Sequence, residues 1–105
     1  HATNGVVVER VDGLESDDVR DLAVALRDKP EIRCAVLASA TDGGGVALVA
    51  ACTPDSGLDA GDLLSGAFKH IGGGGGRNPE LCVAGGKNPA GIDEALAVVR
   101  AAAGI

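Results

Sequence analysis

Aromatic residues and methionine are nearly absent from this sequence of 105 residues. It has no methionine, tryptophan or tyrosine, and Phe68 is its one aromatic residue. The apolar fraction of 46% therefore comes almost entirely from alanine, valine, leucine and isoleucine. A chain of this length forms one domain and buries about two thirds of the surface that its unfolded form exposes. We expect a single core of small aliphatic side chains, which suits layers of helix and sheet.

Signals for membrane insertion or secretion are also lacking. No apolar run approaches the roughly 18 to 20 residues that span a bilayer, and no basic leader precedes an apolar stretch. The chain begins at His1 without an initiator methionine. We therefore expect a fragment of a longer protein that is soluble and cytoplasmic, with no membrane partner.

Cysteine is scarce, and its spacing is not that of a metal site. Cys34, Cys52 and Cys82 are odd in number and widely separated, and no C-x-x-C pair occurs. Cys34 and Cys52 lie inside strand-like apolar runs, where a free thiol behaves as a small hydrophobic group. We expect buried structural cysteines in a reducing compartment, no metal site and no cofactor in this domain.

The charge is unevenly distributed along the chain. The formal net charge of −6 argues against nucleic acid when it is taken alone, because phosphate-binding surfaces are usually basic. Residues 1–68 hold five basic and twelve acidic side chains, whereas residues 69–87 hold three basic and one acidic. Only this second segment is positive, so an anion would bind there.

The apolar spacing predicts an α/β (α+β) fold in the order β-α-β-β-α-β-α, with a single mixed sheet packed with about three helices. Ser16 is predicted to cap the first helix, and Asp17, Asp18 and Asp21 favour its positive end, which explains these acids better than a metal site does. We predict strands over 5–11, 32–40, 46–52 and 81–84, and helices from Ser16 to before Pro30, over 59–70 and over 91–103.

Five consecutive glycines follow the second predicted helix. Glycine is costly to order, by about 0.5–1 kcal/mol relative to alanine, so such a run needs a reason. It is either a flexible linker or a place where a ligand or another backbone approaches the main chain closely. Because the run lies inside one small domain between apolar elements, we favour close approach.

Cations surround the glycines, which suits binding of phosphate to exposed N–H groups. The alternative interpretation is that these cations are scattered charges that face solvent and bind no ligand. The candidate binding residues are Lys69, His70, Gly72, Gly73, Gly74, Gly75, Gly76, Arg77, Gly85, Gly86 and Lys87.

Known nucleotide loops and catalytic arrangements do not fit this segment. In a P-loop alignment Leu81 replaces the first glycine and Asn88 replaces the serine or threonine. In a dinucleotide fingerprint counted from Gly72, Arg77 replaces the last glycine. His70 is the one internal histidine that could act as a general base, and no motif places a nucleophile beside it. We therefore predict no catalytic residues.

The stretch from Ala67 to Arg77, A-F-K-H-I-G-G-G-G-G-R, followed by Ala84-Gly85-Gly86, resembles the signature of the DHH-associated domain that ends alanyl-tRNA synthetases. The likeness covers nearly the whole chain, 1–105, in the expected order. Gly72 to Gly76 with Arg77 match the family's glycine loop, and Gly85 and Gly86 match its second glycine pair. Lys69, His70 and Lys87 are added from their charge and proximity.

The resemblance implies a function in tRNA recognition. In that family the domain is not itself catalytic, binds the outer corner of tRNA and helps aminoacylation and editing act on one tRNA. The implied partners are alanine-specific tRNA and the other domains of a parent alanine–tRNA ligase. That parent would use ATP, magnesium and zinc elsewhere in its chain.

Two differences from the family and two alternative functions remain. Asn78 intervenes after the glycine loop, and Cys82-Val83-Ala84 lacks the glutamine usual before the second glycine pair. The same domain also occurs in DHH phosphoesterases, where a related motif ending in histidine holds a nucleotide's phosphate; Arg77 favours the synthetase. In a purely structural domain, the glycines would instead allow close packing of helix against sheet.

Overall fold

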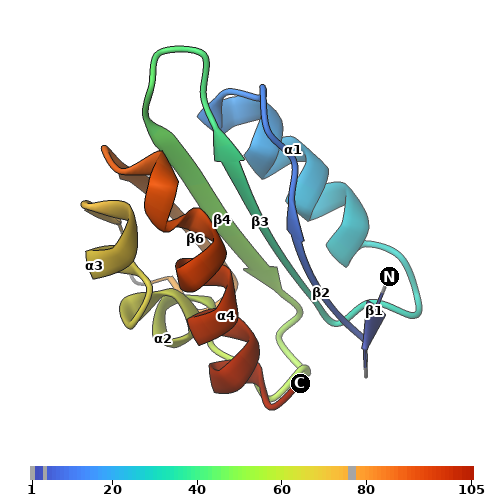
Figure 1. Ribbon diagram of the computed structural model, residues 1–105. Coiled ribbons are helices and arrows are strands. Elements are labelled where there is room, and N and C mark those ends of the chain that lie inside the picture. The colour runs from blue at the N-terminus through green and yellow to red at the C-terminus, as the bar shows by residue number, and fades with distance from the viewer. Residues whose placement is uncertain (1, 4, 76–77) are drawn as a thin grey trace.

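The strands form one sheet of six strands in the order β1-β2-β3-β4-β6-β5 (Figure 1). The structure is a computed structural model that describes residues 2–3, 5–75 and 78–105. β2 and β3 are parallel, and the other neighbouring pairs are antiparallel, so the predicted mixed sheet is confirmed. The elements are β1 (Ala2–Thr3), β2 (Val6–Arg10), α1 (Ser16–Arg27), β3 (Cys34–Ala40), β4 (Val46–Cys52), α2 (Ala60–Ser65), α3 (Phe68–Ile71), β5 (Gly74–Gly75), β6 (Leu81–Gly86), the 3₁₀ turn η1 (Pro89–Gly91) and α4 (Ile92–Ala103).

β3 and β4 form the centre of the domain, and both of their faces are covered. Every residue of β4 and all but the last residue of β3 are buried, as the unbroken apolar runs predict. The two strands pair from Cys34 opposite Cys52 to Ala40 opposite Val46. Many of the buried positions are alanines, whose small side chains let helices approach the sheet from both sides.

α1 connects the parallel strands β2 and β3 and packs on one face of the sheet. Parallel neighbours need a crossover connection, and a helix commonly provides it. Asp17 and Asp18 lie in the first turn and Arg27 in the last, so charges of favourable sign lie at each end of the helix. Val19 and Ala23 are completely buried against a cluster that includes Leu37.

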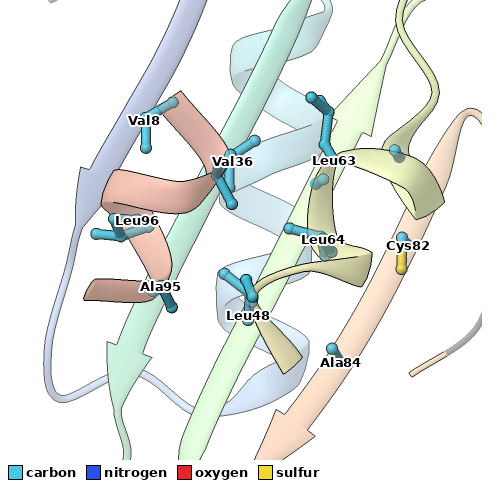
Figure 2. Packing of buried hydrophobic residues seen from close by; sticks show 14 of the residues in the cluster. Val8, Val36, Leu48, Leu63, Leu64, Cys82, Ala84, Ala95 and Leu96 are labelled. Carbon is cyan, nitrogen blue, oxygen red and sulfur yellow. The ribbon is translucent and has the colours of Figure 1, made fainter. Parts of the chain in front are cut away.

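The opposite face is covered by α2, α3 and α4 (Figure 1), and α4 packs against β2 and β3. Figure 2 shows Val36 and Leu48 from the strands lying beneath Leu64 and Leu96 from the helices. At about 25 cal/mol per Å² of apolar surface, this burial is the main stabilising contribution. The larger of the domain's two main apolar layers therefore lies on the face that also carries α3 and the glycine-rich segment.

The helix predicted over 59–70 is interrupted in the middle. It begins as predicted, because the Asp59 side chain accepts a hydrogen bond of 3.0 Å from the N–H of Asp62. α2 then ends at Ser65 with Gly66 as its C-cap residue, and α3 starts at Phe68. A β carbon at Gly66 would come within 3.2 Å of the Val98 side chain, so the break lies where the chain passes close to α4. This is a tertiary contact that apolar spacing does not reveal.

The prediction that Ser16 caps α1 is wrong. Glu15 is the N-cap residue, Ser16 is the first residue of the helix, and no side chain caps it. The preceding loop sets this start, because the Ser39 hydroxyl on β3 bonds both the N–H and the carbonyl of Leu14. The two-residue strands β1 and β5 were also not predicted, because they are too short to show a pattern.

The helices are short. Within the described ranges, none is long and apolar enough to cross a membrane.

Replacing Ser39 by alanine should destabilise the domain. Ser39 is fully buried, accepts from the Leu14 N–H at 3.0 Å and donates to the Leu14 carbonyl at 2.8 Å. Loss of both bonds leaves main-chain groups unpaired, which costs about 1–3 kcal/mol. Urea unfolding of Ser39→Ala measures this, with the exposed Ser65→Ala as a control that should change by under about 0.5 kcal/mol. Equal stability of the two variants would contradict the assigned role of Ser39.

Candidate functional site

The glycine-rich segment begins as the end of α3. Gly72 has φ 68° and ψ 40°, the left-handed conformation that closes many helices and that glycine adopts at least cost. The N–H of Gly73 then donates to the Phe68 carbonyl at 3.1 Å, which satisfies one carbonyl of the short helix. The first glycine of the run is therefore needed for the turn itself.

The end of α3 is joined to the turn after β6 by main-chain hydrogen bonds. The Ile71 carbonyl accepts from the N–H groups of both Lys87 and Asn88, each at 2.8 Å. The Asn88 side-chain amide donates to the His70 carbonyl at 3.0 Å. Since helix-terminal carbonyls have no partner within the helix, these three bonds replace the missing ones. They bring the two glycine segments of the sequence into contact.

Close contact here excludes side chains at two glycines. A β carbon at Gly86 would overlap the Ile71 carbonyl, and one at the buried Gly91 would overlap the His70 carbonyl. Both positions face the main chain of α3, which approaches them directly. Glycine at these positions is a packing requirement of the domain.

The next glycines form β5, which pairs with the outer side of β6 at the edge of the sheet. Gly74 lies opposite Gly85, and Gly75 lies opposite Ala84. A β carbon at Gly73 or Gly75 would collide with the main chain of β6. β5 is thus part of the sheet rather than a linker, and close packing accounts for these two glycines.

Gly74 and Gly85 differ from their neighbours because they have space around them. A β carbon at Gly74 would meet no atom closer than the Phe68 ring at 4.0 Å, and one at Gly85 would lie 3.6 Å from the Val46 carbonyl. Both residues are exposed. Main chain without side-chain cover is therefore accessible on this edge strand, where an incoming group can approach it closely.

The charged candidates lie around this edge. Lys69 on α3 and Lys87 after β6 are exposed, and neither forms an ion pair within the described ranges. His70 is different, because its side chain is only 25% exposed and its Nδ1 lies 3.3 Å from a carboxylate oxygen of Glu94 on α4. His70 thus contacts α4, and the two lysines are the candidates available to an anion.

Most of the predicted site residues are brought together by the fold. Lys69, His70 and Gly72 to Gly75 lie on α3 and β5, next to Gly85, Gly86 and Lys87 at the end of β6. Gly76 and Arg77 lie outside the described residues, so the structure does not test them. Among the described residues, no group of three or more histidine, cysteine, aspartate or glutamate side chains could hold a metal ion.

Sequence reasoning missed two residues at this edge. Asn88 was considered only as a mismatch to the P-loop pattern. Asparagine side chains readily form hydrogen bonds with nearby main chain, and the position of Asn88 in a turn between Lys87 and Pro89 could have indicated such a bond. Phe68 entered only as the one aromatic residue, and it packs against the core cluster. It is half-buried there, and its ring also faces the open position at Gly74.

The fold and its edge strand define the class of the protein. It is a small α/β domain with a mixed sheet, helices on both faces of the sheet, and a short edge strand of glycines that packs against the main chain of β6. The chain belongs to the DHHA1 domain family, whose pattern matches residues 3–104. The resemblance found in the sequence is thereby confirmed.

The curated proteins that are similar to this chain in sequence are alanine–tRNA ligases. The Chlorobaculum tepidum protein is 42% identical over 97 residues, which cover 89% of this chain and 11% of that protein. The Thiobacillus denitrificans protein is 41% identical over 102 residues, which cover 93% and 12%. The chain thus spans only about a ninth of the length of these relatives.

A solved structure shares the fold. The C-Ala domain from Aquifex aeolicus alanyl-tRNA synthetase superposes with a TM-score of 0.80 at 23% identity, covering 91% of this chain and 87% of that one. The predicted arrangement of one mixed sheet and its helices is therefore found in a solved domain.

Adjacent glycines should respond differently to alanine. Gly86→Ala forces a β carbon against the Ile71 carbonyl and should cost about 1–3 kcal/mol, as overpacking usually does. Gly85→Ala has room and should change stability by under about 0.5 kcal/mol. Urea unfolding of the two variants measures the difference. If Gly85→Ala is as destabilising as Gly86→Ala, the contact between α3 and the β6 turn is not the reason for the second glycine.

Proposed function

We propose that this domain is a tRNA-binding module of an alanine–tRNA ligase, without catalytic activity of its own. It contacts the outer corner of alanine-specific tRNA and helps the aminoacylation and editing domains act on one bound tRNA. Its other partners are the remaining domains of the parent ligase, which binds ATP, magnesium and zinc elsewhere, in the cytoplasm. Membership of the DHHA1 family and the alanine–tRNA ligase relatives support this proposal.

The observation that carries the proposal is the exposed main chain of β5, which has a lysine on the preceding helix and another directly after the strand it pairs with. Gly72 to Gly75 are exposed and have no side chains, so a phosphate can approach the peptide groups directly. Lys69 lies on α3, Lys87 follows the last residue of β6, and Arg77 follows β5 in the sequence. N–H groups and cations together bind phosphate by charge-assisted hydrogen bonds.

The surrounding charge restricts the RNA contact to this edge. Residues 1–68 hold twelve acidic and five basic side chains, so most of the remaining surface repels a polyanion. A contact with few phosphates is weak and has a shallow salt dependence. It becomes effective in a longer chain, because a tRNA that is already bound elsewhere raises the local concentration at this site.

The isolated domain should bind folded tRNA better than tRNA whose corner is disrupted. Titration at low salt of intact tRNA, and of a variant whose D and T loops cannot pair, measures the preference. Short oligonucleotides and cyclic dinucleotides serve as competitors and should displace tRNA poorly. Equal binding of both tRNAs, or no binding of either, would sink the proposal. Preferential binding of the short nucleotides would support the phosphoesterase relatives instead.

Removal of a cation at the edge should weaken RNA binding without unfolding the domain. Lys87→Ala and Arg77→Ala should each raise the Kd about fivefold, which corresponds to a lost contact of about 1 kcal/mol. The slope of log K against log salt should fall in magnitude by up to about 1. Lys29→Ala is the matched control, because Lys29 is exposed just after α1 and should leave the Kd unchanged.

Thermal unfolding of these variants tests whether the substituted cations stabilise the domain or serve RNA binding. The melting temperature should stay nearly constant, because surface substitutions usually cost under about 0.5 kcal/mol. A large fall in melting temperature for Lys87→Ala, with unchanged RNA affinity, would favour a purely structural edge.

A further inference from the structure

Two buried thiols face each other across the central strands. Cys34 is the first residue of β3 and Cys52 is the last residue of β4, and they lie directly opposite each other in the register. Their Sγ atoms are 2.8 Å apart, and both residues are fully buried. The RNA-binding proposal makes no use of this pair.

The main-chain hydrogen bonds show which kind of cross-strand pair this is. The Cys34 N–H donates to Gly5 on the β2 side, at 3.2 Å, and the Cys52 N–H donates to Glu80 on the β6 side, at 2.8 Å. Both groups point away from the shared β3–β4 border, so the two cysteines occupy a non-hydrogen-bonded pair. In such pairs the Cα atoms are about 4.5 Å apart and the side chains are closest. That separation lies within the range of about 4.4–6.8 Å that a disulfide requires.

The environment also distinguishes the two sulfurs chemically. The hydrogen bond between the two thiols lowers the pKa of Cys34, and the nearby Arg33 acts in the same direction. The same bond, together with burial, raises the pKa of Cys52. Cys34 is therefore the sulfur that carries negative charge more readily, and the thiolate is the reactive form.

We propose that Cys34 and Cys52 form a dithiol modification site, which a small-molecule disulfide such as oxidised glutathione converts to a disulfide between β3 and β4. The Cys34 thiolate attacks one sulfur of the oxidant, forms a mixed disulfide and releases one thiolate. Cys52 loses its proton, attacks the Cys34 sulfur and expels the second thiolate. The two cysteines are oxidised, and one disulfide is reduced to two thiols.

The position of the pair limits how the oxidant reaches it. Both sulfurs are buried, so exchange needs a local opening of the structure. The pair lies at the end of both strands, where β4 leaves the sheet at Thr53 and the chain continues to the exposed residues Pro54 and Asp55. Separation of these strand ends is therefore the local opening through which we infer that the oxidant reaches the thiols. The reaction is thus slow and selective for small oxidants.

Incubation of the reduced, folded domain with excess oxidised glutathione, followed by acid quenching, tests the proposal. Intact-mass spectrometry should show a loss of about 2 Da, the mass of two hydrogen atoms, and peptide mapping should link residues 34 and 52. The melting temperature should rise by about 5–10 °C, because the bond closes the hairpin loop between the two cysteines. Dithiothreitol should reverse both changes.

Single substitutions identify the sulfurs. Cys82→Ala removes the third thiol of the same apolar cluster (Figure 2) and should leave the mass loss unchanged. Cys34→Ala should abolish it, with folding checked by thermal unfolding. If Cys34→Ala fails to fold, the peptide map of Cys82→Ala still decides. Three alkylatable thiols after long oxidation, or a bond that includes Cys82, would overturn the proposal.

Discussion

The contact on which the functional edge depends is the one between the last turn of α3 and the turn that follows β6. The Ile71 carbonyl accepts two N–H groups from that turn, and Gly86 and Gly91 have no side chains that would keep the two main chains apart. A four-residue helix has few internal hydrogen bonds, so it needs such partners to persist. The same contact joins the helix that carries the exposed Lys69 to the turn that carries the exposed Lys87.

The centre of the domain also depends on small side chains, because they let the helices approach the sheet closely. The alanines of β3 and β4 let α1 pack on one face and α2 and α4 on the other. Cys34 and Cys52 fit these strands as small hydrophobic residues, and the register then makes them opposite neighbours. The small size of the two cysteines thus explains their place in the packed strands, and the strand register explains why their sulfurs are close together.

The glycines of this domain fall into two groups, which differ in what surrounds the position of a side chain. At Gly73, Gly75 and Gly86 the protein's own main chain occupies the space where a side chain would be. At Gly74 and Gly85 that space is empty and faces solvent. The packed glycines hold the edge strand in place, and the open ones leave its main chain accessible. The RNA contact proposed for this edge is compatible with an acidic protein because the positive segment, residues 69–87, is short.

The sequence by itself determined the order of the longer elements, the two central apolar strands and the positive segment, because apolar periodicity, glycine turns and charge are local properties. It also determined the family, because the glycine signature is specific. Only the tertiary structure decided that the second helix breaks at Gly66, that Asn88 bonds α3, and which glycines are packed or open. These features depend on groups far apart in the sequence, such as Gly66 and Val98, and no local pattern records such a contact.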